Sequence, residues 1–327
     1  MWWPRLYKIA RRGAVLVMAP PMLALALHAL ATAGCSSPTV RWRWRAKSGW
    51  RFAPHGTPAV SPDGTLFVPA LRQHVGLNQG WLLALDANGT QRWRNETGSS
   101  DSGFDQCSLC ATVGGAAGSV LALAGVGSTM AVGTRTGEVS WRFRVAGGDP
   151  AVGHKSGTVF VGGGYPPAVH ALSPTTGSEL WHAAGAGGSP AVSDDETTVY
   201  AGGRPGSATE ALFALDTRTG RQRWRTSVPG GLLGGGPPVI GSDAIFLVSN
   251  CSCQGPHRLI KLSADSGAVQ WRAPLSLWAS VPPTLSAQHG LVFLVEYTLR
   301  DGNAANSTLV AICTESGAAR VGVLAER

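Results

Sequence analysis

Cysteines are the residues of this sequence whose type and spacing come nearest to a reactive site. Four of the six cysteines form two close pairs, Cys107 with Cys110 in CSLC and Cys251 with Cys253 in CSC. Two such pairs could supply four thiolates to zinc, but about 140 residues separate them, unlike the ligands of compact zinc motifs. Cysteines of an exported chain form disulfides by default. We therefore predict disulfides within this set and no metal site, with zinc as the alternative.

Other side chains capable of catalysis are scattered. The histidines lie far apart and without metal-ligand spacing, at His55, His74, His154, His170, His182, His257 and His289. The carboxylates Asp101, Asp105 and Glu210 form no cluster, and no GxSxG, P-loop or HExxH pattern is present. We therefore predict no catalytic residue, and we expect the remaining cysteine, Cys313, to be a buried structural residue.

The first 34 residues have the layout of a secretory signal. Four basic residues precede an apolar run from Ala14 to Ala33, which is followed closely by Cys35. The stretch TAGC resembles a bacterial lipobox, in which the cysteine is lipidated and becomes the mature N-terminus, although Thr32 departs from the usual leucine. We expect lipidation of Cys35. A plain cleaved signal or an uncleaved anchor are the alternatives, and Pro20-Pro21 disfavours a continuous membrane-spanning helix.

The charge of the expected mature chain is modest. The first 34 residues hold four of the 27 basic residues and no acidic one, which leaves 23 basic against 19 acidic residues, a net charge of +4. Apart from VRWRWRAK (40–47) and QRWRN no basic stripe is concentrated enough to predict nucleic-acid binding. Ser36 stands where lipoproteins retained in the inner membrane have aspartate, so we expect an exported protein, either an outer-membrane lipoprotein or a periplasmic one.

Six copies of one motif organise the rest of the chain. A glycine lies four residues before a tryptophan or its substitute in LLALDANGTQRW (82–93), MAVGTRTGEVSW (130–141), VHALSPTTGSELW (169–181), LFALDTRTGRQRW (212–224), LIKLSADSGAVQW (259–271) and LVAICTESGAARV (309–321). Between the copies lie a Pro-Ala-Val type strand start and a run rich in Val and Phe. Each interval thus carries signals for four short strands, and 44 Gly, 21 Pro and 14% charged residues agree with an all-β chain.

The motif predicts a repeated contact between neighbouring sheets. Its third strand is apolar at consecutive positions, 212–215 in one copy, which predicts burial on both faces. Asp216 and Gly220 suit a tight turn, because the carboxylate can accept backbone hydrogen bonds and glycine adopts positive φ. The tryptophan after the turn then covers the gap between sheets. We predict this docking role for Trp44, Trp93, Trp141, Trp181, Trp224 and Trp271.

The pattern A-x-D-x-x-T-G-x-x-x-W resembles the tryptophan-docking repeat of PQQ-type (quinoprotein-like) β-propellers, a family that includes BamB-type lipoproteins of outer-membrane protein assembly. Its period of 40 to 50 residues is typical of propeller blades. We predict an all-β propeller of six four-stranded blades over 40–327, with an incomplete seventh blade as the alternative. A signal peptide (1–34) and a lipidated linker (35–39) would precede it. Either 40–46 or 318–327 could supply the strand that closes the ring.

The resemblance implies two functions. The first is a non-catalytic envelope scaffold, BamB-like in type, that is monomeric, binds proteins or peptides and carries no cofactor. The alternative is a degenerate PQQ-dependent dehydrogenase or its accessory subunit. As the resemblance implies, members that bind PQQ have eight blades, calcium held by carboxylates, a catalytic aspartate and a disulfide between adjacent cysteines. This chain has no Cys-Cys dipeptide and is too short for eight blades, so we favour the scaffold.

Long connections predict the binding face. In a four-stranded blade the second-to-third and fourth-to-first connections emerge on one face, and here they include 69–80, 95–107, 249–258 and 296–307. Long connections in compact folds often bind partners. We therefore predict partner binding near Asn95–Cys110 and Ser249–Arg258, with Asp101, Asp105, Gln254 and His257 as candidate contacts. The alternative is that these loops only vary in length and that the cysteines brace them.

Overall fold

The computed structural model is an all-β protein. It describes residues 42–43, 50–52, 58–74, 77–100, 110–115, 120–125, 128–145, 148–203, 210–229, 232, 236–249, 257–275, 278–279, 282–300 and 303–320. The chain divides into a unit of residues 1–39, which lies outside these ranges, and a unit of residues 40–327, which holds every described strand. Within the described ranges no helix is long and apolar enough to cross a membrane.

Six antiparallel sheets follow one another along the chain. The first contains β1 (Trp50–Phe52), β2 (Ala59–Val60), β3 (Leu66–His74), β4 (Leu77–Leu85) and β5 (Gln91–Ser100), and the second contains β6 (Cys110–Gly114), β7 (Val120–Gly125), β8 (Ser128–Gly133) and β9 (Val139–Phe143). The third contains β10 (Ala151–Val152), β11 (Val159–Gly163), β12 (Ala168–Leu172) and β13 (Glu179–Ala184), and the fourth contains β14 (Ala191–Val192), β15 (Thr198–Gly202), β16 (Ala211–Asp216) and β17 (Gln222–Ser227).

The last two sheets continue this plan. The fifth contains β18 (Val239–Ile240), β19 (Ala244–Ser249), β20 (Arg258–Ser263) and β21 (Val269–Pro274). The sixth contains β22 (Trp278–Ala279), β23 (Thr284–Ser286), β24 (Leu291–Arg300), β25 (Asn303–Cys313) and β26 (Ala319–Arg320), with the 3-10 helix η4 (Ala287–His289) between β23 and β24. In the first and sixth sheets two short strands pair with one long strand, which gives these sheets five strands.

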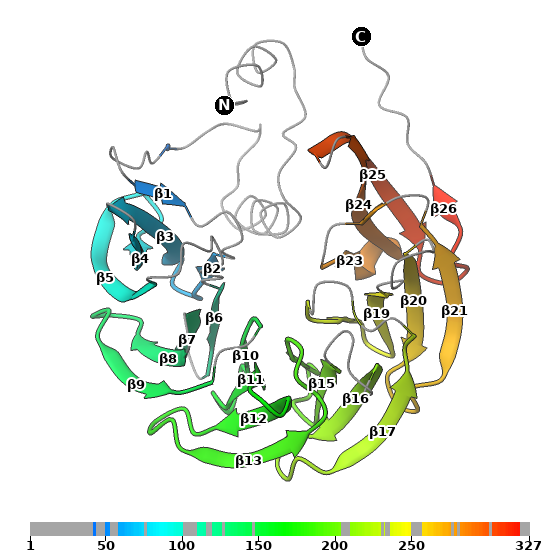
Figure 1. Ribbon diagram of the computed structural model, residues 1–327, viewed down its shortest axis with the longest axis horizontal. Coiled ribbons are helices and arrows are strands. Elements are labelled where there is room, and N and C mark those ends of the chain that lie inside the picture. The colour runs from blue at the N-terminus through cyan, green and yellow to red at the C-terminus, as the bar shows by residue number, and fades with distance from the viewer. Residues whose placement is uncertain are drawn as a thin grey trace. The chain divides into compact units, whose positions relative to one another are not determined.

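The sheets are arranged as the blades of a propeller. Their inner strands β2, β6, β10, β14, β18 and β23 contact one another in chain order, and the outer strands lie at the perimeter (Figure 1). In the second to fifth sheets the strands run in sequence order from the inner to the outer strand. The predicted all-β propeller class is therefore confirmed, and in these four sheets each repeat interval forms four strands.

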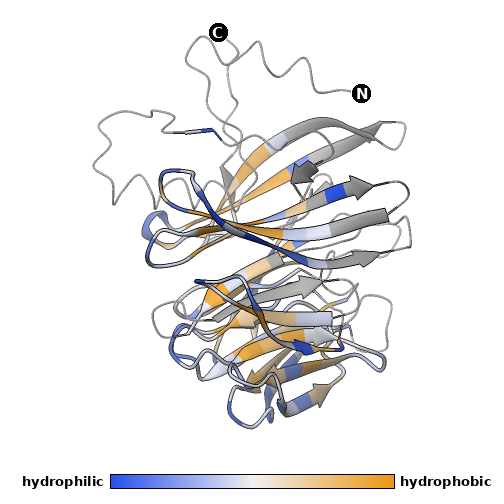
Figure 2. Cartoon of the chain, turned by 90° about the vertical axis from the view of Figure 1, so that its left-hand side faces the viewer, coloured by the Kyte–Doolittle hydropathy of each residue, from blue (hydrophilic) through white to orange (hydrophobic). Residues whose placement is uncertain are grey.

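The hydrophobic core lies between the blades. Five consecutive residues of β16, from Ala211 to Leu215, are buried. Phe213 packs with residues of the third sheet, whereas Leu212 packs with residues of the fifth. Successive side chains of one strand thus enter two different layers, which is why the consecutive apolar residues of the motif are needed. Hydrophobic residues run along the middle strands, and hydrophilic ones occupy turns and outer strands (Figure 2).

Two of the segments that we predicted to be long connections consist mainly of strands. Residues 69–80 belong mainly to β3 and β4, which pair as far as His74 with Leu77. Residues 296–307 belong mainly to β24 and β25, which pair as far as Arg300 with Asn303. The prediction was wrong because the sequence between the strands is short enough for a hairpin turn. In the second case this sequence is Asp-Gly, a strong hairpin signal.

The other two predicted connections are described only in part. Residues 95–100 continue β5, and 101–107 lie outside the described residues. Ser249 ends β19 and Arg258 begins β20, with His257 just before it, whereas 250–256 lie outside the described residues.

Candidate functional site

A tight turn joins the third and fourth strands of each blade, and its chemistry is clear in the fourth sheet. Asp216 Oδ1 accepts hydrogen bonds from the amide of Thr219 at 3.0 Å and from its hydroxyl at 2.8 Å. Arg223 Nη2 lies 2.9 Å from the other carboxylate oxygen. The hydrogen bonds from Arg223 and Thr219 lower the pKa of Asp216 to about 2. The carboxylate is therefore ionised at neutral pH and serves the turn.

From the second sheet to the sixth, each turn receives a tryptophan from the preceding sheet. Trp181 of β13 donates its indole N–H to the carbonyl oxygen of Thr217, in the turn of the fourth sheet, at 2.8 Å. Its ring lies against Gly220, where a Cβ atom would come within 2.6 Å of Trp181 Cε3. Gly220 also has a φ of +70°. Glycine is thus required here both for the backbone conformation and for the space that the ring occupies.

We call this contact between a tryptophan and the turn of the next sheet a joint. The same joint connects the other consecutive sheets. The indole N–H groups of Trp93, Trp141, Trp224 and Trp271 donate to the carbonyl oxygens of Thr134 (3.0 Å), Pro174 (2.9 Å), Ala264 (2.9 Å) and Thr314 (3.0 Å). Each tryptophan leaves the turn of its own blade and reaches the turn of the next one. A change in the spacing between glycine and tryptophan would move the ring away from its acceptor.

On the first sheet this position is taken by Trp42. Its indole N–H donates to the carbonyl oxygen of Ala87 at 2.9 Å, and a Cβ atom on Gly89 would lie 2.6 Å from its ring. Trp44, which we predicted for this role, lies outside the described residues. Two tryptophans separated by one residue point to the same side of an extended strand. The segment carries no glycine turn that could set its register, so the sequence could not distinguish them.

Sequence reasoning missed a second aromatic ring in these joints. Ring centroids lie 5.7 Å apart for Phe67 and Trp93, 5.9 Å for Phe160 and Trp181, 5.7 Å for Tyr200 and Trp224, and 6.0 Å for Phe246 and Trp271. The Tyr200 hydroxyl also donates to the carbonyl oxygen of Ala264, at 3.3 Å. The sequence does contain a pattern that indicates this ring, because each of these residues is the aromatic member of the Val-rich run that forms the second strand of its repeat.

A carboxylate adds a second link between the third and fourth sheets. Glu196 has a φ of +59° and accepts hydrogen bonds from the amides of Lys155 at 2.5 Å and Ser156 at 3.1 Å. His154 Nδ1 lies 3.0 Å from the same carboxylate. Burial acts to raise the pKa of Glu196, but the amides of Lys155 and Ser156, the Ser156 hydroxyl and His154 together lower it, so the net shift is downward. The sequence could not reveal this link, because it depends on two turns 40 residues apart.

Two histidines and a glutamate form a polar cluster on the third sheet. His170 of β12 and His182 of β13 are cross-strand partners. Their Nδ1 atoms lie 2.6 and 2.8 Å from the two carboxylate oxygens of Glu179. Hydrogen bonds from His170 and His182 lower the pKa of Glu179. Phe143 of the second sheet packs on His170 with ring centroids 5.4 Å apart.

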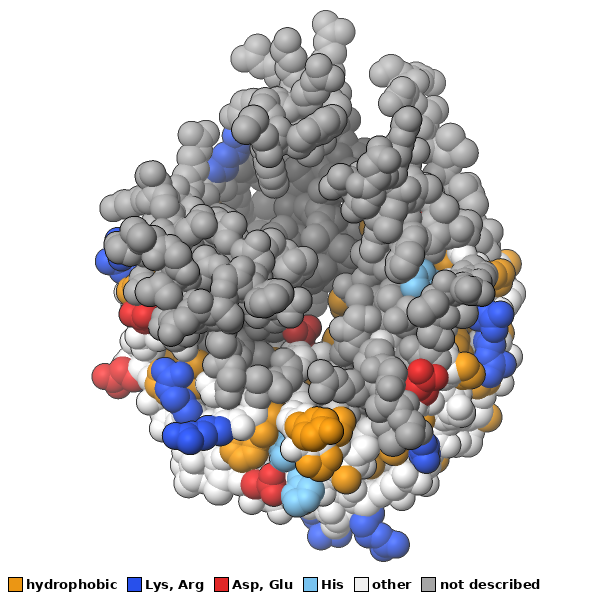
Figure 3. All heavy atoms as spheres, viewed as in Figure 1, with side chains coloured by type: hydrophobic (Ala, Val, Ile, Leu, Met, Phe, Trp, Pro, Cys, Tyr) orange, Lys and Arg blue, Asp and Glu red, His pale blue; other side chains and the backbone are white. Residues whose placement is uncertain are grey.

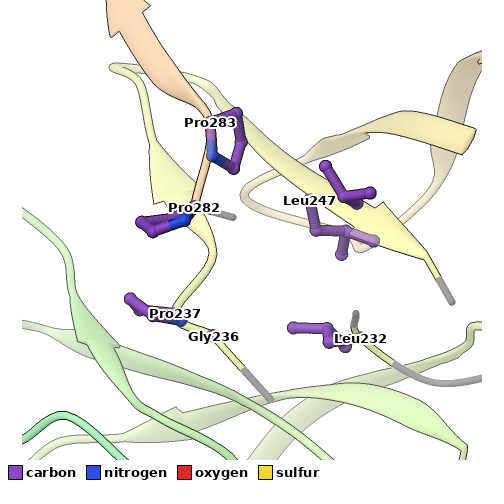
Figure 4. Close-up of a pocket in the computed structure, with 7 residues that line it drawn as sticks. Leu232, Gly236, Pro237, Leu247, Pro282 and Pro283 are labelled. Carbon is purple, nitrogen blue, oxygen red and sulfur yellow. The ribbon is translucent and has the colours of Figure 1, made fainter. Parts of the chain in front are cut away.

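A small apolar hollow lies between the fifth and sixth sheets. It is lined by Leu232, Gly236, Pro237, Leu247, Val248, Pro282 and Pro283 (Figure 4). Its empty volume is about 180 Å³, open solvent included. PQQ is an anionic quinone whose carboxylates require cationic or hydrogen-bonding partners. The lining residues carry no polar side chain, so the hollow does not fit that cofactor.

The predicted site residues are only partly described. Asp101, Asp105, Gln254, Cys35, Cys107, Cys251 and Cys253 lie outside the described residues, and nothing is described of the side chain of Cys110. His257 is buried at the base of its loop, with Nδ1 3.3 Å from the carbonyl oxygen of Ser249.

Cys313 takes the place of the motif aspartate in the sixth sheet. Its thiol is free and half-buried, so the prediction of a buried residue was wrong. The amide and hydroxyl of Ser316 and the amide of Glu315 lower the pKa of this thiol, because the position is built to receive hydrogen bonds from the turn. Among the described residues no three of His, Cys, Asp and Glu are grouped to hold a metal ion.

Comparison with known proteins identifies one family. A family model described as outer membrane protein assembly factor BamB matches residues 125–225 and 208–320, which together make up more than half of the chain. No curated protein sequence matches the chain significantly.

Solved structures resemble the chain in fold. BamB from Moraxella catarrhalis has a TM-score of 0.57 at 17% identity, with 86% of this chain and 87% of that chain covered. A quinohemoprotein alcohol dehydrogenase from Pseudomonas putida HK5 has a TM-score of 0.50 at 12% identity, with 81% and 59% covered. Hydrazine synthase from Kuenenia stuttgartiensis has a TM-score of 0.50 at 13% identity, with 86% and 68% covered. At these identities the likeness concerns the propeller fold alone.

Proposed function

The chain belongs to the family described as outer membrane protein assembly factor BamB, and from this premise we propose that it is a non-catalytic scaffold of the bacterial envelope. In this role the propeller binds other envelope proteins or peptides. The family match carries the proposal. The described motif residues support it, because Asp216 and Trp224 are engaged in turns and joints. Function is decided by such sites and not by the fold.

The alternative is a degenerate PQQ-dependent dehydrogenase or its accessory subunit. Titration calorimetry of the purified chain with PQQ and calcium separates the two functions. The scaffold predicts no saturable heat with PQQ, with or without calcium. Micromolar PQQ affinity together with oxidation of an alcohol would overturn the scaffold.

Membrane attachment through Cys35 is part of the proposal. A diacylglycerol with an amide-linked chain supplies the several acyl chains that stable anchoring requires. Ser36 favours the outer membrane as the destination. Cys35→Ser should leave the protein unprocessed or soluble and move it out of the membrane fraction. Unchanged partition of this variant would refute the lipid anchor.

We further propose that the ring closes as six blades. The last motif copy has Val321 where five others have tryptophan, and Trp42 donates to the turn of the first sheet in the manner of the other joints. The N-terminal segment then supplies the ring that the last motif lacks. Trp42→Ala should lower the denaturation midpoint as much as Trp224→Ala, whereas Trp44→Ala should lower it little. The reverse order would contradict this closure.

The predicted partner face remains a proposal near Asn95–Cys110 and Ser249–Arg258. Disulfides from the two cysteine pairs would tether these segments. Exchanging both segments for short Gly/Ser turns should abolish recovery of partners from envelope extracts while cooperative unfolding of the ring persists. Recovery that survives the exchange would move the binding surface elsewhere. Mass spectrometry of non-reduced peptides tests the disulfides directly.

A further inference from the structure

The third sheet departs from the repeat at one cross-strand pair. His182 follows the motif tryptophan Trp181, and its partner on β12 is His170, with the two ring centroids 5.9 Å apart. In the first, second, fourth and fifth sheets the equivalent pair joins an apolar residue to an arginine, as Leu83–Arg94, Met130–Arg142, Phe213–Arg225 and Ile260–Arg272. Among these five sheets only the third places two imidazole rings side by side.

Solvent reaches both rings. The side chain of His170 is 14% exposed and that of His182 is 59% exposed. Figure 3 shows histidine side chains beside an acidic one at the surface over the third sheet. A small ligand can therefore approach the pair without any opening of the sheet.

One carboxylate orients both rings. The two oxygens of Glu179 lie 2.6 Å from His170 Nδ1 and 2.8 Å from His182 Nδ1. An ionised carboxylate only accepts hydrogen bonds, so each Nδ1 carries a proton and donates it. In a neutral imidazole the other nitrogen, Nε2, then has a free lone pair. Glu179 thus holds both rings in the tautomer in which Nε2 can bind a metal ion, as carboxylates beside metal-binding histidines do.

The two Nε2 atoms have small neighbours. They point away from Glu179, because the two nitrogens lie on opposite sides of an imidazole ring. A Cβ atom on Gly164 would be 3.8 Å from His170 Nε2, so this neighbour has no side chain in the way. In the direction away from Glu179, the next residues on the same face of the two strands are Ala168 and Ala184, which are also cross-strand partners. Short side chains therefore leave room beside the two rings.

The separation of the rings suits a single ion. Imidazole nitrogen binds zinc at about 2.0 to 2.1 Å, so two rings on one ion can have centroids up to about 6.5 Å apart. The observed distance of 5.9 Å lies within this limit. In the described part of the chain no three side chains of His, Cys, Asp and Glu are grouped to hold an ion. The ion therefore has two protein ligands, with water at its remaining positions.

From these observations we propose that His170 and His182 bind a divalent transition-metal ion such as Zn²⁺ through their Nε2 atoms. Glu179 is the positioning residue of both rings. Imidazole nitrogen suits ions of this class, whereas Ca²⁺ and Mg²⁺ take oxygen ligands. The sequence analysis predicted no metal site, because the spacing of the two histidines along the chain is not that of a metal motif. The site is additional to the proposed scaffold function and does not depend on it.

The test uses the full chain, freed of metal with EDTA, and zinc alone as the probe. Titration calorimetry should show a saturable site for one ion. His182→Ala should weaken zinc binding by about tenfold or more, since loss of even an outer partner of a ligand has that effect. His182 is exposed, so this variant should keep the parent melting temperature. His154→Ala, at a histidine 56% exposed that lies 3.0 Å from Glu196, is the matched control and should bind zinc as the parent does.

Glu179→Gln tests the positioning role. It keeps both ligands but loses the charged acceptor, and should weaken zinc binding by about tenfold. The affinity of the parent should fall as the pH drops from about 7.5 to 5.5, because protons compete with the ion for the imidazoles. An unchanged affinity of Glu179→Gln would refute the positioning role of this carboxylate.

Cobalt distinguishes the histidine site from the cysteine pairs. Co²⁺ bound by thiolates has an intense ultraviolet charge-transfer band, whereas Co²⁺ bound by imidazole and water has only weak visible bands. We expect the weak bands, and we expect them to disappear in His182→Ala. Absence of saturable zinc binding, equal zinc affinity of the parent and His182→Ala, or a thiolate band that His182→Ala leaves intact would each overturn the proposal. None of these results would affect recovery of envelope partners, which tests the scaffold function separately.

Discussion

The third and fourth sheets are built on the same plan but present different surfaces. Both have four strands in the same order, and both receive a tryptophan on the glycine of their turn, Trp141 on Gly177 and Trp181 on Gly220. The cross-strand pair on their outer strands differs. It is His170 with His182 in the third sheet and Phe213 with an arginine in the fourth.

The difference separates two kinds of position in the repeat. A residue of the joint serves its own sheet and the next one, so a change there disturbs two blades at once. A residue of the outer strand that faces solvent and enters no joint, such as Arg225, can vary without such a cost. Arg225, whose guanidinium lies 5.2 Å from the centroid of Phe213, places a cation on the outer strand of the fourth sheet, whereas β13 carries no arginine or lysine. Individual function should therefore be sought where a blade departs from the repeat.

The largest effect is expected from the joints themselves. Trp181→Ala and Trp224→Ala each remove a ring from between two blades and should each lower the free energy of unfolding by about 3 to 5 kcal/mol. Tyr165→Ala, at a residue 95% exposed, should change it by less than about 0.5 kcal/mol. Chemical denaturation measures all three. A loss for Tyr165→Ala as large as for either tryptophan would mean that the joints do not dominate stability.

The glycine beneath each ring gives the next largest effect. Alanine at Gly177 or Gly220 would hold a φ of +67° or +70° and place Cβ within 2.4 or 2.6 Å of a tryptophan ring. Each change should cost about 2 to 4 kcal/mol, as the sum of backbone strain and overpacking. Gly64 has a φ of +80°, but a Cβ atom at this position would contact only Ala87, at 3.7 Å. Gly64→Ala should cost about 1 to 2 kcal/mol from strain alone. If all three variants lost the same free energy of unfolding, contact with the tryptophan ring would not be the cause of the loss.

Glu196 tests whether the joint between the third and fourth sheets has a second support. Glu196→Gln should lower the free energy of unfolding at pH 7 by about 1 to 2 kcal/mol, because two amides lose a charged acceptor. The folded-state pKa of Glu196 is lowered. Its contribution is therefore present above the ordinary glutamate pKa and is lost as the pH falls through the folded value. The parent and the variant should converge as the pH falls below the ordinary glutamate pKa and through the lowered folded value. A constant difference at every pH would exclude the ionised carboxylate as the cause.

The smallest effect on the free energy of unfolding is expected when the turn of the fourth sheet is given the residue of the third-sheet turn. Ser173 stands in the third sheet where Asp216 stands in the fourth. Asp216→Ser should cost about 1 kcal/mol at pH 7, since the ion pair with Arg223 is partly exposed and screened. Because the pKa of Asp216 is lowered from 3.8 to about 2, the difference should fade as the pH drops from 4 to 2. Guanidinium titrations at pH 7 and pH 2 measure this change. A variant that matches the parent at pH 7 would show that the hydroxyl serves the turn equally well.

Much of the fold could be read from the sequence because it repeats. The spacing of Gly220 and Trp224 occurs in five copies, and the consecutive apolar residues of each third strand predict a strand buried on both faces. These signals are local, since each depends on residues within one turn or one strand. The long hairpins of the first and sixth sheets were missed because their two-residue connections were read as parts of longer loops.

The contacts between blades depended on tertiary structure. Residues about 40 positions apart meet there, as Glu196 meets Lys155 and Trp42 meets Ala87, and no local pattern encodes such pairs. The cluster of His170, His182 and Glu179 is also a tertiary property, because it follows from the pairing of β12 with β13. The sequence by itself determined the repeating unit through turn geometry and hydrophobic pattern. Packing of one unit on the next decided which tryptophan docks at the first sheet and which turn Glu196 binds.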